Sequence, residues 1–322
     1  MKATYEFQTS QALSKSGNID WVKSTPFLGV HIACLAAFWT GVSWKVLALC
    51  LAMYLVRMFG ITAGYHRYLS HKAFKTSRFF QFGLALMGCL AMQKGPLWWA
   101  AYHRHHHQHT DQPEDAHSPS HRGLWWAHVG WFLCDRHDEA DFSLIKDLTR
   151  YPELVWLNHY PTIPGLALAV TCLLALGWQG LIWGFFMSAV MSYHGTFAIN
   201  SICHVYGSVR YKTSDTSRNN VIFGVISLGE GWHNNHHHYS TSARIGFFWW
   251  EIDIAYYVLQ VLAFFRIVWE LKHPSQAALE AKAEYTADNP NLNIVPSRLF
   301  RRVRQKDAMT YSPEGLRPGD YR

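Results

Sequence analysis

The chain has 322 residues, a formal net charge of +7 and 16% charged residues, a share well below the roughly 25% of soluble domains. Aromatic residues make up another 16% and include 15 Trp, so the composition indicates a protein that lies partly in lipid. The modest positive charge is typical of basic loops that face anionic lipid rather than of nucleic-acid binding. The six Cys include no CxxC pair, which argues against a zinc ribbon or an iron–sulfur site.

Residues 1–25 are polar and lack the apolar core of a cleavable signal peptide, so we expect a cytoplasmic segment there. Four apolar stretches follow, and each approaches the ~20 residues that are needed to cross ~30 Å of hydrocarbon. They are residues 26–43, 45–64, 161–176 and 178–202. Very short connections join them in pairs, which predicts two transmembrane hairpins. Of the 29 Lys and Arg, only Lys45 lies in a hairpin connection, so the positive-inside rule places both termini and the long middle segment in the cytoplasm.

Two more apolar stretches, residues 79–99 and 247–269, do not fit this topology as crossing helices. If residues 79–99 crossed, the histidines on either side could not share a metal, and if residues 247–269 crossed, the basic tail would lie outside. We therefore expect both to be helices at the membrane surface. Residues 271–322 are polar, so the sequence predicts a membrane domain over residues 26–270 followed by a cytoplasmic tail.

Histidine makes up 20 residues of the chain, and three groups of them carry the functional signal. The first group is His66 and His71, the second lies in His103-Arg104-His105-His106-His107, and the third lies in His233-Asn234-Asn235-His236-His237. In an α-helix, residues i, i+3 and i+4 share one face. The two longer groups therefore each present three imidazoles on one face: His103, His106 and His107, and His233, His236 and His237. His66 and His71 are five residues apart, so they require a helix end or a distortion to face one way.

His204, at the cytoplasmic end of the fourth predicted span, is a ninth candidate ligand. Asn200 lies one turn earlier and could hold a metal-bound water. Nine imidazoles exceed what one metal accepts, so two metals are expected, although imidazole suits Zn, Cu, Fe and Ni alike. The isolated histidines are expected to pack or to lie at the membrane interface, and His117 and His121 to support the site or face solvent. The isolated histidines are His31, His128, His159, His194 and His273.

This HxxxxH, HRxHH and HNxHH pattern, placed between two hairpins, resembles the membrane fatty acid desaturases, and most of all the acyl-CoA Δ9 (stearoyl-CoA) branch. Residues 60–67 are similar to the first box of that branch, residues 200–204 to its NSxxH and residues 229–233 to its GEGxH. Residues 95–101 are similar to the bacterial members, which suggests a bacterial inner membrane. The resemblance covers about residues 25–270 and implies an all-α membrane protein whose four spans carry a cytoplasmic helical cap with a dimetal site.

The resemblance also implies a function, an O₂-dependent desaturase that places a cis double bond, expected at Δ9, in a saturated acyl chain. Its cofactors would be two iron ions. One iron would be bound by His66, His71, His103, His107 and His236, and the other by His106, His204, His233 and His237, with Asn200 holding a water. The kinked acyl tunnel would be lined at Gln93, Trp99, Thr196 and Phe197.

The acyl carrier and the electron source stay open. Ala101 and Tyr102 replace an Arg-Asp pair that meets coenzyme A in animal members, so coenzyme A, acyl carrier protein and a phospholipid all remain candidates. The chain has no GxGxxG, cluster cysteines or HPGG segment. Electrons are therefore expected from a separate ferredoxin, rubredoxin or cytochrome b5 with its NAD(P)H reductase.

Two other interpretations were considered. An acyl hydroxylase on the same scaffold would share the first hydrogen abstraction. A His-rich metal transporter would place ionisable groups near the bilayer midplane, whereas the predicted spans are almost free of them, with His31 and His194 as exceptions.

Overall fold

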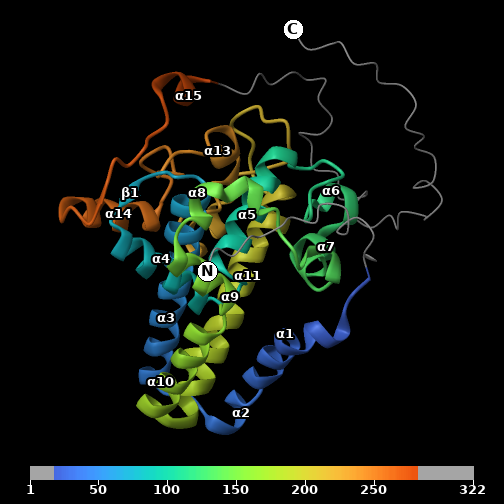
Figure 1. Ribbon diagram of the computed structural model, residues 1–322, viewed down its shortest axis with the longest axis vertical. Helices are drawn as coiled ribbons and strands as arrows, with labels where there is room; N and C mark the ends of the chain where they lie inside the picture. Colours follow the sequence, from blue (N-terminus) through green and yellow to red (C-terminus); the bar gives the residue numbers. More distant parts are fainter. Residues whose placement is uncertain (1–17, 282–322) are drawn as a thin grey trace.

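The computed structural model describes residues 18–281 and is mostly helical (Figure 1). Most of the expected amino-terminal segment, residues 1–17, and of the expected tail, residues 282–322, lies outside the described residues. A bundle of long helices carries a cap of short elements at one end. The bundle contains α1 (Trp21–Cys34), α2 (Ala37–Thr40), α3 (Trp44–Phe59), η2 (Gly60–Ser70), α10 (Ile163–Gln179), η6 (Gly180–Met187) and α11 (Ser188–Ser201).

The cap is built from shorter elements that gather at one end of the bundle. Its larger helices are α4 (Arg78–Leu90), α5 (Pro96–His109), α9 (Pro152–His159), α12 (Val221–Ile226), α13 (His233–His238) and α14 (Ile254–Phe264). Its smaller elements are β1 (Lys75–Thr76), α6 (Pro119–Arg122), α7 (Leu124–His128), η3 (Gly130–Phe132), η4 (Asp135–His137), η5 (Phe142–Ile145), α8 (Lys146–Thr149), η7 (Ile202–His204), β2 (Val268–Trp269) and α15 (Gln276–Glu280).

Three helical stretches of the described chain are long and apolar enough to cross a membrane: Trp21–Thr40, Trp44–Ser70 and Ile163–His204. The last has 42 residues, and its backbone leaves the helical conformation at Leu176 and at Gly177, whose φ is +61°. Glycine adopts this left-handed conformation without steric cost. The chain reverses there, so that α10 and η6 pack side by side, and a Cβ at Gly180 would lie 2.1 Å from the Cys172 carbonyl oxygen. The predicted hairpin connection at residues 176–178 coincides with this reversal.

The first helical stretch begins five residues before the predicted start of the first span. The Asp20 side chain accepts hydrogen bonds from the backbone N–H groups of Val22 and Lys23, both 3.0 Å long. This N-cap satisfies amides that the helix itself leaves unpaired, and it therefore sets the helix start among polar residues ahead of the apolar run.

The two apolar stretches that we did not count as spans form helices of 13 and 11 residues, α4 and α14. Both are too short to cross ~30 Å of hydrocarbon at 1.5 Å per residue. The first prediction was too long, because residues 91–95 turn between α4 and α5. This turn lets the second histidine group lie beside the first.

The cap is tied to the bundle by a buried ionic network around Arg67 of η2. Its guanidinium contacts Glu230 Oε1 at 3.1 Å and Asp253 Oδ1 at 2.9 Å, and all three side chains are buried. A two-stranded antiparallel sheet pairs Lys75 with Trp269. The described part of the expected tail also packs on the cap, because the Lys272 N–H donates to the Ala73 carbonyl.

Candidate metal centre

His66 lies on η2, the continuation of α3, which is a π-helix rather than an α-helix, and His71 caps the carboxyl end of η2. In a π-helix the backbone bonds join residues five apart, so residues i and i+5 become neighbours on one face. The His71 N–H donates to the His66 carbonyl at 3.2 Å, which is such a bond. The wider helix is therefore the distortion that lets His66 and His71 face one way.

The other two groups lie on α5 and α13; a side chain caps the amino end of α5, and two buried asparagines fix α13. Asn158 Oδ1 accepts from the first free amides of α5, those of Leu97 and Trp98, at 3.1 and 2.9 Å. On α13 the two residues between the histidines are buried anchors. Asn234 Oδ1 accepts from the Tyr211 N–H at 2.8 Å, and the Asn235 amide donates to Glu251 at 2.8 Å. The HNxHH spacing therefore turns three imidazoles toward the other histidines. The two asparagines point to the opposite side of α13, where they are also buried.

The structure brings the nine imidazoles together in two groups, each with ligand nitrogens within 4.8 Å of one another. The first group is His66, His71, His103, His107 and His236, and the second is His106, His204, His233 and His237. These are the same residues as the two ligand sets that the resemblance implied. They come from η2, α5, η7 and α13, four elements that are far apart in the sequence.

The nitrogen positions in the first group fit a cation better than they fit mutual hydrogen bonds. His236 Nε2 lies 3.0 Å from Nε2 of His66 and 2.9 Å from Nε2 of His107, while His71 and His103 approach to 2.7 Å between their Nε2 atoms. One N–H can be donated only once, so several lone pairs converge on the same volume. A metal ion satisfies all of them, and the residues present fit such an ion.

In the second group the Nε2 atoms of His204 and His233 lie 3.0 Å apart, and Nε2 of His237 is buried without a hydrogen-bond partner among the described residues. Burial lowers the pKa of His233, and the neighbouring imidazoles lower it further. Burial also lowers the pKa of His237, although the Asp215 carboxylate acts to raise it. Burial has the same effect on His71, His103, His107 and His236. These side chains are therefore held neutral, which is the form that binds metals.

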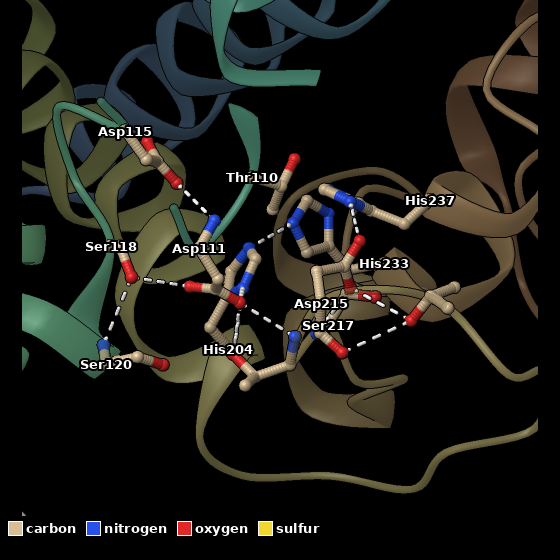
Figure 2. Close-up of polar contacts among 12 residues, drawn as sticks. Thr110, Asp111, Asp115, Ser118, Ser120, His204, Asp215, Ser217, His233 and His237 are labelled. Atoms are coloured by element: carbon tan, nitrogen blue, oxygen red, sulfur yellow. Dashed lines mark hydrogen bonds and ion pairs between the residues drawn. The ribbon is translucent and has the colours of Figure 1, made fainter. Parts of the chain in front are cut away.

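In four of these histidines, the second ring nitrogen, Nδ1, lies against a buried carboxylate. Figure 2 shows Asp111 lying between Ser118 and His204, and Asp215 lying against His237. The distances from Nδ1 to a carboxylate oxygen are 2.5 Å for His66 and Glu230, 3.1 Å for His106 and Asp115, 3.4 Å for His204 and Asp111, and 2.8 Å for His237 and Asp215. Nδ1 of His106, His204 and His237 donates its proton to the carboxylate, so the Nε2 lone pair of these three is left free for a metal, while Glu230 lies against Nδ1 of His66 as an ion-pair partner.

Asp115 shows how these carboxylates stay charged while buried. Burial acts to raise its pKa, but the nearby His106 and His117 outweigh that effect and hold the pKa below its ordinary value. Burial acts to lower the pKa of His106, but the Asp115 carboxylate outweighs burial and raises this pKa above its ordinary value. Backbone amides of Asp111 and His117 also donate to Asp115 at 3.0 and 3.2 Å, so its orientation is fixed.

Two cavities meet beside the histidine groups. The larger, of about 460 Å³, is lined by aromatic and aliphatic side chains of α1, α5, η3 and α11, and the smaller, of about 40 Å³, lies among the ligand histidines. Trp99, His103, Thr196 and Asn200 line both cavities. Gln93 and Phe197 line the larger one, and Gln93 Nε2 donates to Thr196 Oγ1 at 3.1 Å. All four residues expected to line an acyl tunnel therefore lie along one cavity that ends at the histidines.

The remaining histidines lie outside the two groups. His117 is buried with its ring centroid 4.3 Å from that of His106, and burial lowers its pKa to about 3. His121 is exposed. On the far side of α5, His105 stacks on His109. His31, His128 and His194 form a separate chain of hydrogen bonds between α1, α7 and α11.

Sequence reasoning missed the four carboxylates. Asp111 and Asp115 follow the second histidine group within eight residues, which was an available signal, since metal-bound histidines usually have a carboxylate on their other nitrogen. Glu230 stands inside the GEGxH motif, but no role was assigned to it. Asp215 has no local signal, because it lies 22 residues before its partner His237.

A family model for fatty acid desaturases matches residues 42–269. The sn-1 stearoyl-lipid 9-desaturase of Anabaena variabilis is 38% identical over 78% of this chain and 93% of its own length. Delta-9 acyl-lipid desaturase 1 of Arabidopsis thaliana is 37% identical over 80% of this chain and 85% of its own. Acyl-CoA 5-desaturase AL21 of Anemone leveillei is 34% identical over 81% of this chain and 85% of its own.

Proposed function

Because the chain belongs to the fatty acid desaturase family and is a desaturase enzyme, we propose that it places a cis Δ9 double bond in a saturated acyl chain. The observation that carries this proposal is the cavity of about 460 Å³ that reaches His103, one of the nine imidazoles of the two histidine groups. Two of the relatives are named for position 9, and one is named for position 5. Product analysis therefore decides at which carbon this enzyme places the double bond.

We propose that the two histidine groups hold two iron ions. The first would be bound by His66, His71, His103, His107 and His236, and the second by His106, His204, His233 and His237, with Asn200 holding a water. When bound, the iron pair supplies the O₂ activation and the oxidising power that side chains lack. Four of the histidines have a carboxylate against Nδ1, which leaves the Nε2 lone pair free to bind a metal. These carboxylates belong to Asp111, Asp115, Asp215 and Glu230.

The side chains of the cavity position the acyl chain. Trp99 stacks on His103 with ring centroids 4.9 Å apart, so a methylene group against Trp99 lies next to a ligand histidine. Gln93 and Thr196 bond to each other across the cavity, which satisfies two polar groups that the acyl chain cannot pair with. The apolar walls exclude water and hold one methylene pair in reach, and such positioning lowers the barrier of the reaction.

The net reaction consumes the saturated chain, O₂, two electrons and two protons, and yields the cis-monounsaturated chain and two water molecules. The electrons would come from a separate ferredoxin, rubredoxin or cytochrome b5 with its NAD(P)H reductase. Among the described residues, the groups that could hold a metal ion contain histidines and Asp115 but no cysteine, which is the ligand of iron–sulfur clusters.

We further propose that the chain crosses a bacterial inner membrane four times, with both termini and the cap in the cytoplasm. The reversal at Gly177 supports two crossings in the stretch Ile163–His204, because a straight helix of that length would far exceed a bilayer. The short apolar helices α4 and α14 would then lie at the membrane surface. Phe79 and Phe264, which are 86% and 82% exposed, would insert their rings among the lipids.

The test is expression in a desaturase-deficient host, followed by mass spectrometry of the total acyl chains. We expect new monounsaturated chains with the double bond between C9 and C10. His106→Ala should abolish them, while His105→Ala, on the far side of the same helix, should retain most of the activity. Products heavier by one oxygen would instead establish a hydroxylase, and unchanged acyl chains with the wild type would refute the proposal.

A further inference from the structure

The smaller cavity beside the metal centre lies between the two histidine groups. His66 and His103 of the first group line it, and so do His106 and His233 of the second. Its volume of about 40 Å³ exceeds the ~10–15 Å³ that one water molecule needs. A molecule as small as water or O₂ therefore fits there, next to ligand histidines of both groups.

This small cavity adjoins the place where we expect the acyl chain. Trp99, Thr196 and Asn200, together with His103, line both the small cavity and the acyl cavity. O₂ in the small cavity would therefore lie close to the methylene pair that is to be oxidised. A polar side chain that lines the small cavity can act directly on the reaction.

Most of the polar side chains around the small cavity are already engaged by the protein. Thr196 Oγ1 donates to the backbone carbonyl one helical turn earlier at 2.9 Å, and the Ser227 hydroxyl likewise donates to a carbonyl four residues before it. The Glu230 carboxylate pairs with His66 and Arg67 at 2.5 and 3.1 Å. These groups have little capacity left for a further ligand.

Thr62 of η2 is the exception. This residue lines the small cavity and is 0% exposed, and its Oγ1 has no hydrogen-bond partner among the described residues. A buried hydroxyl without a partner is unfavourable, and such a group usually marks a place where a water, an ion or a ligand belongs. The small cavity is the space beside Thr62 that can hold one.

The hydroxyls of α11 and of η2 itself show what a helical hydroxyl ordinarily does, which is to donate to a carbonyl of the preceding turn. On α11, all four Ser and Thr side chains donate in this way at 2.6–2.9 Å: Ser188, Ser192, Thr196 and Ser201. On η2, Ser70 donates to the Tyr65 carbonyl at 2.8 Å. Because Thr62 makes no such bond, its proton is available to a molecule in the small cavity.

We propose that Thr62 is a catalytic residue whose hydroxyl donates a hydrogen bond to O₂ in the small cavity while O₂ is reduced. This inference rests on the proposed desaturase function and adds a residue that is not a metal ligand. Reduction places negative charge on the oxygen atoms, and a fixed donor in a buried site stabilises such charge without reorganisation. No bond of Thr62 breaks in this role, so the net reaction keeps its two electrons and two protons.

Loss of this hydrogen bond should divert electrons from the acyl chain. O₂ that does not oxidise the chain takes up two electrons and two protons and leaves as H₂O₂. Thr62→Val keeps the shape of the side chain but replaces the hydroxyl by a methyl group. We expect the variant to form double bonds at least about tenfold more slowly and to release more H₂O₂ for each double bond.

The first experiment is a single turnover of the purified full-length, iron-loaded protein in vesicles. The protein is reduced with stoichiometric dithionite without air and mixed with O₂, and stearoyl chains are supplied both in phosphatidylcholine and as stearoyl-CoA. Double bonds and H₂O₂ are then measured. Thr62→Ser, which restores the hydroxyl, should recover the rate to within about threefold of the wild type. Thr171→Val is the control, because the Thr171 hydroxyl donates to the Ala167 carbonyl of α10 and lines neither cavity, and it should behave as the wild type.

The two levels of the account fail differently in this experiment. Wild-type rates and wild-type H₂O₂ in Thr62→Val would overturn the role of Thr62 and leave the desaturase function intact. Conversion of neither stearoyl carrier by the wild type would refute the proposed function itself.

A readout that does not depend on turnover uses azide, a small anion, as a probe of the oxidised, iron-loaded protein. We expect Thr62→Val to bind azide at least about tenfold more weakly than the wild type, since a hydrogen bond to a charged group is lost, and Thr62→Ser to bind it nearly as well. Iron content and thermal unfolding should not change, because the hydroxyl has no partner in the protein to lose. Equal azide affinities, or loss of iron in both Thr62→Val and Thr62→Ala, would overturn the inference.

Discussion

Each carboxylate beside the histidine groups decides which ring nitrogen carries the proton. The His237 imidazole donates from Nδ1 to Asp215 at 2.8 Å, and Asp215 is itself fixed by the Ser217 N–H at 2.9 Å. A ligand histidine whose partner is removed can rotate and can adopt the other tautomer. Loss of such a partner typically lowers metal affinity about 10- to 100-fold.

Asp215→Asn tests this arrangement. We expect the variant to fold and to retain the first metal, but to lose the second about 10- to 100-fold more readily to a chelator. Asp141→Asn is the matched control, because the Asp141 side chain caps the Ser143 N–H and belongs to none of the groups that could hold a metal. Chelator competition followed by metal analysis measures the difference, and equal retention in both variants would show that Asp215 does not orient a ligand.

Arg67→Met tests the buried ionic network. It leaves Glu230 and Asp253 buried without their counter-charge, so we expect a loss of about 3–5 kcal/mol in the free energy of unfolding. Arg78→Met removes a salt bridge whose arginine side chain is 63% exposed, and its loss should be much smaller. Unfolding in detergent, followed by circular dichroism, compares the two. Similar losses would mean that the Arg67 network adds little to stability.

At the residue scale, the histidines could be predicted and their partners could not. The spacing of His103, His106 and His107 fixes a common face by helix geometry alone. In contrast, Asp111 reaches His204 across 93 residues, and Asp215 reaches His237 from an irregular segment. Loop carboxylates are placed by tertiary packing, which no local periodicity records.

At the scale of single elements, the π-helix η2 is the feature that the sequence did not reveal. The sequence shows only the spacing of five residues between His66 and His71, which requires a distorted helix but does not say of which kind. The helix is seated by close packing on α4, since a Cβ on Gly60 would lie 2.4 Å from the Met87 carbonyl carbon and one on Gly64 would lie 2.8 Å from the Leu84 carbonyl oxygen. Glycine at both positions lets the two backbones touch.

Gly60→Ala should therefore push η2 away from α4. We expect a loss of about 1–3 kcal/mol in stability, typical of overpacking, together with weaker metal binding through displacement of His66. Gly83→Ala on α4 is the control, because its added Cβ meets nothing within 4 Å, and it should be neutral or slightly stabilising. If thermal unfolding and metal content were the same in both variants, this packing argument would fail.

The helix ends were also harder to predict than the helices. The Asp20 cap starts α1 ahead of the apolar run, and the turn at residues 91–95, where Met92 and Lys94 have positive φ, interrupts a run that reads as continuous. Hydropathy follows side-chain type, whereas these boundaries depend on backbone hydrogen bonds and on turns that tertiary contacts stabilise.

For the whole molecule, the proposed topology places the hairpin connections and the metal centre on opposite sides of the membrane. Lys45→Cys and Lys212→Cys, both at exposed positions, test this in a background without Cys34. A membrane-impermeant maleimide added to intact spheroplasts should label position 45, and position 212 should react only after lysis. Labelling of both from one side would contradict the four-span topology.

The central claim is that four distant elements bring nine imidazoles together to hold two irons. The most direct measurement is the iron content of the purified full-length protein by mass spectrometry of the metals, combined with Mössbauer spectroscopy. We predict two irons per chain, both with nitrogen-rich ligation, and a loss of one or both in His106→Ala and His236→Ala. A single metal per chain, or two metals that persist in both variants, would contradict the account.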